Sequence, residues 1–499
     1  MTIEVLQTIF SVPNLLMMNV GVAAGIIIGA LPGLNVVFAI AILLPLTFGM
    51  ESIAGMYLML GAYCGAVYGG SITAILINTP GTPAACATAL DGYPLNQKGR
   101  AADALKAALV ASSIGGLISA ASLLFLAPMI AKASLSIQAP EYFALCIFGL
   151  CTVIGIAGDK VIKGILMALL GLTCSTIGID PVEGTQRLMF GNLNLMAGLK
   201  PVSILLGVFA LCEILLKSRE LYGAQPGSAV GAIKYQKATL KVLEILKRWK
   251  DWLFSSIYGI VIGAVPGTGG VIAAMFSYND AKRRSKHPEE FGQGCIEGVI
   301  APEAANNATT AATLIPLLTF GIPGDASVAV LLGALTMQGI TPGLSLFSSE
   351  GTWVYSIMLG LLLINIFMLL QGSAFTRIFA NFSRIPPILL PPCIMILCVV
   401  GAYSINNIPF DIFIMIGAGL FGFIMKKFEM PIQPFIVGLV LGELMETNLR
   451  RSLVMSAGSP IIFFARPVSV FFLLLGLLAL ASPLLRAARS RGKAMGSFG

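Results

Sequence analysis

The sequence predicts an all-α, polytopic membrane protein built from two inverted-topology repeats, and three observations lead to this fold class. Of its 499 residues, 57% are hydrophobic and only 11% are charged, whereas about a quarter of the residues in a soluble domain are charged. The mean hydropathy is +0.91 over the whole chain, which allows many segments of about 20 apolar residues to cross a bilayer. Similar Pro-Gly interruptions recur in the two halves. We therefore expect roughly ten to fourteen membrane elements, some of them re-entrant or discontinuous helices broken at Pro-Gly.

Composition also excludes several classes of protein. The net charge of +8 could suggest nucleic-acid binding, but Lys and Arg lie between apolar runs, so membrane topology explains them and no nucleic-acid partner is expected. Nine cysteines without a repeated CxxC pair, and the single histidine His287, support neither a disulfide framework nor a zinc site. No GxxxxGK[ST] phosphate-binding loop is present. We predict a protein that is not an enzyme and that needs no cofactor beyond a coupling ion, H⁺ or Na⁺.

The distribution of basic residues predicts the domain organisation. Lys and Arg are absent from residues 1–97 and then cluster at Lys98, Arg100 and Lys106, and a longer basic stretch follows after residue 216. Such clusters are expected to face the cytoplasm. Leu240, Leu243, Leu246 and Trp249 recur among lysines and fit a basic amphipathic helix on the membrane surface, although a solvated linker explains them equally well. The predicted units are an N-terminal membrane repeat 1–216, a basic cytoplasmic linker 217–250, an inverted C-terminal membrane repeat 251–485 and a cytoplasmic tail 486–499.

Each half contains two breaks in similar positions. In the first half Pro32-Gly33 is followed 48 residues later by Pro80-Gly81, and in the second half Pro266-Gly267 is followed 57 residues later by Pro323-Gly324. Proline removes a helical hydrogen bond and glycine lets the chain turn, so each site should interrupt a helix. Single breaks are common kinks, but four in a repeated arrangement favour a lined cavity at membrane depth.

The flanking charges predict that the halves have opposite orientations. The turn after the second break leads to Lys98 and Arg100 in the first half but to Glu350 in the second, in a stretch from Pro288 to Thr376 without Lys or Arg. These two turns should face opposite sides of the membrane, which is the signature of an inverted repeat. The side on which Arg450 and Arg451 lie is left open by this pattern.

The broken segments are candidates for binding an anionic substrate. A helix that starts at a break presents free N–H groups and a positive dipole end to an anion. Because no Lys or Arg occurs in 1–97 or 288–376, we expect these N–H groups and a co-bound cation to balance the substrate's charge. The predicted substrate-binding residues are Pro32, Gly33, Asn35, Asn78, Thr79, Pro80, Gly81, Thr82, Pro266, Gly267, Thr268, Pro323, Gly324 and Asp325.

A second polar cluster precedes the fourth break and is a candidate site for the coupling ion. Side-chain oxygens of this kind suit a hard cation such as Na⁺, and an ionisable residue in an apolar region is a functional hypothesis by default. Interhelical packing is the alternative for the small polar residues, and N-terminal capping is favoured over ion carriage for Asp325. The predicted coupling-ion residues are Glu303, Asn306, Asn307, Thr309 and Thr310, with Na⁺ as the metal they could hold.

Several long strings resemble the large membrane subunit of the tripartite tricarboxylate transporters (TctA-like proteins), and the match runs over most of the chain. The strings are Tyr68–Leu76 leading to Asp91-Gly92-Tyr93-Pro94, Pro302–Ala308, Leu318–Gly324, and Gly442-Glu443 through Asn448-Leu449-Arg450. Gln338 and Leu344 depart from the family pattern, which bears on the identity of the substrate.

The resemblance implies a multi-pass protein of the bacterial inner membrane that imports a di- or tricarboxylate by secondary active transport, driven by a proton or sodium gradient. It further implies two partners, a small four-helix membrane subunit and a periplasmic solute-binding protein that delivers the carboxylate. A self-sufficient carboxylate and cation transporter without a binding protein is the alternative. A channel is less favoured because it needs no paired breaks. A membrane-embedded enzyme is less favoured because the sequence shows no catalytic nucleophile and no set of metal ligands.

Overall fold

The computed structural model describes residues 2–31, 34–133, 137–156, 160–180, 183–216, 238–267, 269–382 and 390–495. These residues are almost entirely helical, and the predicted all-α membrane fold is confirmed at this level. Two short strands, β1 (Gly178–Ile179) and β2 (Gln186–Arg187), pair antiparallel near one end of the molecule.

Helices make up most of both halves of the chain. The first half contains α1 Thr2–Ile9, α2 Val12–Gly29, α3 Val36–Leu43, η1 Leu44–Thr47, α4 Ser52–Ile77, α5 Ala85–Gln97, α6 Ala101–Ala133, α7 Ala139–Ile156, α8 Val161–Ser175, η4 Leu193–Leu195, α9 Pro201–Leu205 and the π-helix η5 Leu206–Leu211. The second half contains α11 Val242–Lys247, α12 Trp249–Gly263, α13 Gly269–Arg284, η6 Pro288–Glu290, α14 Glu297–Ala312, α15 Leu314–Phe320, α16 Ala326–Met337, α17 Leu344–Ser349, α18 Gly351–Phe382, α19 Leu390–Asn406, α20 Pro409–Lys427, α21 Ile432–Met455, α22 Ile462–Ala465 and α23 Pro467–Met495.

Within the described ranges, five helices are long and apolar enough to cross a membrane: α2, α4, α6, α18 and α20. Six shorter apolar helical segments accompany them, among them α7, α8 and α16. Short apolar helices are expected where spans are broken or re-entrant. The chain is therefore a multi-pass membrane protein, while the count of ten to fourteen membrane elements stays a prediction.

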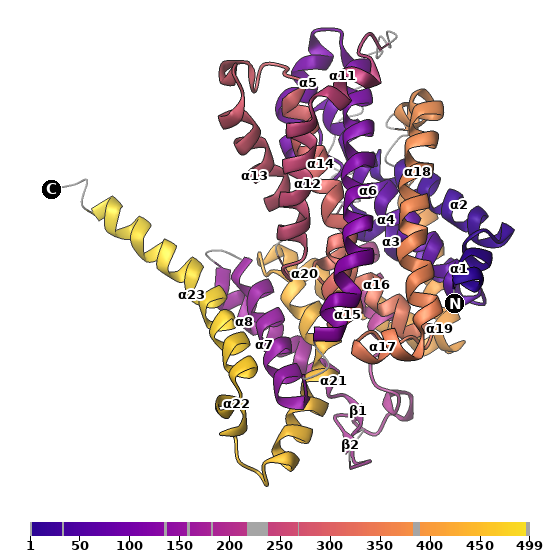
Figure 1. Ribbon diagram of the computed structural model, residues 1–499. Helices are drawn as coiled ribbons and strands as arrows, with labels where there is room; N and C mark the ends of the chain where they lie inside the picture. The colour runs from indigo at the N-terminus through magenta and orange to yellow at the C-terminus, as the bar shows by residue number, and fades with distance from the viewer. Residues whose placement is uncertain are drawn as a thin grey trace.

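Two helical hairpins enter the molecule from opposite ends. In Figure 1, α5, α11 and the turn after α13 lie at the upper end, and α17, α22 and the strands lie at the lower end. The hairpin of α12 and α13 has its open end at the upper end, where Arg284 lies 3.7 Å from Asp251. The hairpin of α2 and α3 points the other way. Its tip lies halfway along α4, because Gly29 at the end of α2 lies beside Ala66. Its open end lies near the start of α4, because Thr47, after α3, lies beside Gly55.

Glycines allow α2 and α4 to pack with their backbones in contact. A Cβ on three α2 glycines would overlap carbonyl groups of α4, and the pairs are Gly21 with Leu58, Gly25 with Ala62 and Gly29 with Ala66. Small residues at every fourth position let membrane helices approach this closely. The second half repeats the arrangement, because Gly259 and Gly263 on α12 lie against Ala305 and Thr309 of α14.

We expect Gly25→Ala to destabilise the protein by about 1–3 kcal/mol, because the added methyl group overlaps the carbonyl of Ala62. The measurement is the thermal unfolding of the purified protein in detergent. Gly417→Ala on α20 is the matched control, since a Cβ there meets no atom within 4 Å. Equal unfolding temperatures for the two variants would contradict the close packing of α2 on α4.

At the second break of each half, the chain folds back against the helix that precedes the break. The N–H of Gly81 donates to the carbonyl of Gly70 over 3.1 Å, and Gly324 packs against Thr313. In both halves the glycine of the break therefore contacts the residue eleven positions before it, and the next helix, α5 or α16, begins after this contact. The long helices α6 and α18 then pack antiparallel, with Leu109 beside Gly372 and Gly116 beside Asn365.

The described part of the basic linker is partly helical, and both interpretations of it, an amphipathic surface helix and a solvated linker, stay predictions. Residues 217–237 lie outside the described ranges, and α11 covers only Val242–Lys247 before Trp249 starts α12. Leu240, which precedes α11, is 8% exposed, whereas Leu243, Leu246 and Trp249 are 61%, 41% and 49% exposed. Leu240 is buried because its N–H, like that of Thr239, donates to the carboxylate of Asp103 on α6.

Candidate functional site

Residues next to all four breaks line one cavity of about 700 Å³, which we call the central cavity. The segments that follow the four breaks, at residues 35–37, 82–84, 267 with 269–272, and 325–327, contribute to its wall. Its lining includes Asn35, Val36, Tyr63, Thr82, Pro83, Glu213, Gly267, Gly269, Gly270, Asn306, Thr309, Asp325, Ser327, Lys426 and Gln433. A volume between 300 and 1,000 Å³ is typical of sites for small molecules.

Four helices begin at this cavity. Asn35 accepts a hydrogen bond from the N–H of Phe38 over 2.9 Å at the start of α3, and Asp325 accepts one from Val328 over 2.9 Å at the start of α16. Thr82 lies before α5, and Gly269, which adopts a φ of +64°, opens α13. Four helix N-termini therefore lie at one space, and such dipole ends favour an anion. Asn35, Thr82 and Asp325 already accept one N–H each at the starts of α3, α5 and α16.

Capping is the observed role of Asp325. Its backbone is extended, with a φ of −152°, and its Oδ1 accepts the Val328 N–H as an N-cap residue does. Gly267, at the third break, donates its N–H to the carbonyl of Gly324 over 2.6 Å and has a φ of +86°, a conformation that glycine adopts readily. The third and fourth breaks are thus held together by their backbones.

Neutral polar side chains complete the wall of the central cavity. The hydroxyl of Tyr63 lies 3.1 Å from that of Thr313, and both residues are buried. Asn306 and Thr309 also face the cavity. The Nδ2 of Asn306 is buried and has no hydrogen-bond partner within the described part of the chain. A buried amide donor without a partner costs free energy, which a ligand acceptor would recover.

A basic residue also lines the cavity, beside the backbone N–H groups that were expected to balance the substrate's charge together with a cation. Lys426, at the end of α20, is the one Lys or Arg among the described residues of the lining. Its Nζ lies 3.0 Å from a carboxylate oxygen of Glu213. The sequence expectation missed Lys426 because it considered only basic residues close to the breaks in sequence.

The predicted coupling-ion residues divide into two groups on adjacent faces of α14. Asn306 and Thr309 line the central cavity, whereas Glu303, Asn307 and Thr310 face the neighbouring helices. The carboxylate of Glu303 is completely buried and accepts hydrogen bonds from the hydroxyls of Thr88 on α5 and Ser112 on α6, the latter over 2.8 Å. Among the described residues, no Lys or Arg pairs with it.

The amide of Asn307 is hydrogen-bonded to the backbone of Glu303. Its Nδ2 donates to the backbone carbonyl of Glu303 over 3.1 Å, and its Oδ1 is buried without a partner among the described residues. Thr310 donates its hydroxyl to the carbonyl of Asn307 over 2.7 Å. A cation near Glu303 would therefore find additional oxygen ligands one turn along α14.

Other predicted substrate residues do not line the central cavity. Asn78 ends α4 with a φ of +54°, a conformation that asparagine tolerates, and both Asn78 and Thr79 are exposed. Gly81 and Gly324 are buried against protein atoms, so the close approach they permit is to backbone and Thr313 rather than to open space. Pro80, Pro266 and Pro323 lie in the breaks without appearing in the lining. Pro32, Gly33 and Thr268 lie outside the described residues.

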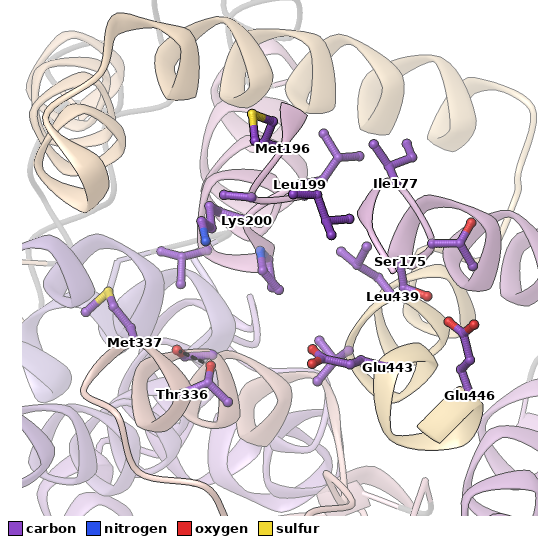
Figure 2. Close-up of a pocket in the computed structure, with 18 of the residues that line it drawn as sticks. Ser175, Ile177, Met196, Leu199, Lys200, Thr336, Met337, Leu439, Glu443 and Glu446 are labelled. Atoms are coloured by element: carbon purple, nitrogen blue, oxygen red, sulfur yellow. Dashed lines mark hydrogen bonds between the residues drawn. The ribbon is translucent and has the colours of Figure 1, made fainter. Parts of the chain in front are cut away.

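A second cavity, of about 580 Å³, lies at the lower end between the strands, the start of α9, the end of α16 and α21 (Figure 2). We call it the hairpin cavity. Close to it, Arg187 pairs with Glu446 over 2.7 Å, and Arg450 pairs with Glu446 and Asp180 over 2.9 and 2.8 Å. Arg450, whose side was left open by the sequence, therefore lies at the lower end in a network of acidic partners.

Sequence reasoning missed three residues of the central cavity. Tyr63 could have been suspected as one of three tyrosines, with Tyr57 and Tyr68, in the apolar run that forms α4. Lys426 stands beside Lys427 in a pair that reads as a cytoplasmic cluster, and no local pattern distinguishes the lysine that faces the cavity. Glu213 could be identified only through its pairing with Lys426.

The chain is similar to one known protein family and to two proteins of Agrobacterium vitis. Residues 15–437 match the model of the tripartite tricarboxylate transporter TctA family. The chain is 36% identical over 485 residues to an uncharacterized 52.8 kDa protein in the TAR-I ttuC′ 3′ region of Agrobacterium vitis, which covers 97% of this chain and 96% of that protein. It is also 37% identical over 233 residues to an uncharacterized protein in the TAR-II ttuC′ 3′ region of the same organism, which covers 47% of this chain and 96% of that protein. No solved structure matches the chain.

Proposed function

The chain belongs to the tripartite tricarboxylate transporter TctA family, and from this membership we propose that it moves a di- or tricarboxylate across the bacterial inner membrane through its central cavity. Membership makes it a tricarboxylate transporter subunit, and the family is one of transporters rather than enzymes. The substrate-binding site, the coupling ion and the partners are what we propose beyond this membership.

The convergence of four helix N-termini on the central cavity is the observation that carries the proposal. A polycarboxylate brings several negative charges into a low-dielectric region, where unpaired charges are costly. The starts of α3, α5, α13 and α16 offer N–H groups and positive dipole ends. Lys426 adds one full positive charge, which the substrate would take over from Glu213.

We further propose that the two halves are inverted repeats about this cavity. The α2–α3 and α12–α13 hairpins point in opposite directions, and the corresponding helices α6 and α18 are antiparallel. The upper end would face the cytoplasm, because it carries Lys98, Arg100 and the cluster Lys282–Arg284. The substrate would then enter at the lower, periplasmic end and leave at the upper end.

Coupling to a proton or sodium gradient is proposed to involve the α14 residues. A buried carboxylate at Glu303 that lacks a basic partner in the described structure attracts a cation, and Asn306 and Thr309 offer oxygen ligands within the central cavity. Binding of the cation would offset part of the substrate's negative charge.

The family description also supports partner proteins. We propose that a small four-helix membrane subunit and a periplasmic solute-binding protein act with this chain, the second of them delivering the carboxylate. A self-sufficient transporter with the same cavity is the second candidate.

Reconstitution in liposomes tests the function. We expect uptake of radiolabelled citrate or succinate to require an inward H⁺ or Na⁺ gradient and to rise when the binding protein is added. Uptake against a concentration gradient after both ion gradients are collapsed would contradict cation coupling. Full uptake without the binding protein would favour the self-sufficient transporter.

A further inference from the structure

The hairpin cavity has a charge arrangement that the proposed central site does not use. In Figure 2, Lys200 lies on one wall and Glu443 and Glu446 lie across the open space from it. Glu446 is neutralised by Arg187 and Arg450. Within the described chain, neither Lys200 nor Glu443 has an ion-pair partner. The cavity therefore offers one free ammonium group and one free carboxylate on opposite walls.

The cavity also offers hydrogen-bonding groups. Arg187 uses its two terminal nitrogens on Glu446, while its buried Nε has no partner in the described structure. Hydroxyls of Ser175, Thr176 and Thr336 belong to the lining. A volume of about 580 Å³ lies in the range of small-molecule sites.

The hairpin cavity lies one layer of side chains from the central cavity. Both cavities contact α16, the helix formed by α9 and η5, and α21. On α16, Ser327 at the central cavity and Gly333 at the hairpin cavity are six positions apart, which is about 9 Å along a helix. On α21, Val437 and Leu439 line the two cavities only two positions apart. The layer includes Leu205, which is fully buried and packs against Gly333.

We propose that the hairpin cavity is a second, entry-side binding site in which Lys200 holds a carboxylate group while Glu443 holds the accompanying cation. This inference rests on the proposed function, because it takes the substrate to be a carboxylate that arrives from the lower end. A molecule at this site waits one layer below the central cavity. The opposite charges on the two walls fit an anion that travels with a cation, since each charge then has a partner.

Equilibrium binding of radiolabelled citrate and succinate to the purified full-length chain in nanodiscs tests the proposal. We expect two sites per wild-type chain. Lys200→Gln should weaken one of them about tenfold or more, as loss of a charged hydrogen bond does, and Lys200→Arg should restore it. Lys426→Gln should weaken the other site. Arg451→Gln is the matched control, because Arg451 is an exposed basic residue at the same end that lines neither cavity.

The outcomes separate this proposal from the proposed function. One site per chain that is weakened by Lys426→Gln but not by Lys200→Gln would overturn the entry site and leave the central carboxylate site standing. Two sites that are both unchanged by Lys200→Gln would also overturn the role of Lys200. Absence of citrate and succinate binding in every variant would contradict both the carboxylate specificity and the entry site.

Discussion

Replacing Lys426 by glutamine is expected to raise the KM for carboxylate uptake about ten- to hundredfold, because a hydrogen bond to a charged group contributes about 1.5–3 kcal/mol. Lys426 is the one basic residue in the described lining of the central cavity, and its present partner is Glu213. The substrate's carboxylate would replace Glu213 at the ammonium group. Initial uptake rates in proteoliposomes over a range of substrate concentrations measure the effect.

The neighbouring lysine provides the control for this substitution. Lys427 is exposed on the same helix and does not line the cavity, so Lys427→Gln should leave the KM within about twofold of wild type, as for a rim charge. Both variants lose one positive charge from the same end of α20. Equal KM values for the two variants would show that the substrate does not contact Lys426.

Glu303→Gln is expected to abolish gradient-driven accumulation while exchange of substrate across the membrane continues. The carboxylate is buried between Thr88 and Ser112 without a basic partner in the described structure, and glutamine keeps its shape while removing the charge that attracts the cation. A driving force of 100 mV is worth about 2.3 kcal/mol per cation. Loss of one coupled cation should therefore lower the accumulation ratio about fiftyfold.

Counterflow in liposomes loaded with unlabelled substrate separates coupling from binding. Glu303→Gln should retain counterflow but lose its response to the ion gradient. Glu289→Gln, which changes an exposed carboxylate at the upper end, should retain both. Accumulation by Glu303→Gln at the wild-type ratio would show that the coupling ion binds elsewhere, and Asn306 and Thr309 would then be the next residues to replace.

Local sequence chemistry predicted where the helices break but not which residues each break packs against. Pro266-Gly267 and Pro323-Gly324 end helices for reasons that lie within a few residues, so a break at each could be expected from the chain alone. The sequence also predicted the capping role of Asp325. The return of Gly81 to Gly70 and of Gly324 to Thr313 depends on packing between helices, for which a hydropathy pattern carries no signal.

Part of the lining of the central cavity could also be predicted from the sequence. Asn35, Thr82, Gly267, Asn306, Thr309 and Asp325 were expected near a common cavity and do line it. Glu303 was grouped with Asn306 because they are close in sequence. In the structure Asn306 lines the cavity, whereas the carboxylate of Glu303 accepts a hydrogen bond from Ser112 on α6. Lys426 comes from a helix more than 100 residues away from Asp325 in the chain, so only the folded arrangement brings it to the cavity.

The thin layer between the two cavities has an electrical consequence. The linings of the two cavities are six positions apart on α16, about 9 Å of helix. If water fills both cavities, most of the membrane voltage therefore falls across this layer instead of across the roughly 30 Å of the hydrocarbon core. Each elementary charge that crosses it gains or loses about 2.3 kcal/mol per 100 mV. An interior-negative voltage repels a tricarboxylate that crosses with two cations, is indifferent to one that crosses with three, and draws in one that crosses with four. The number of cations per substrate therefore decides whether the cell's voltage hinders or powers uptake.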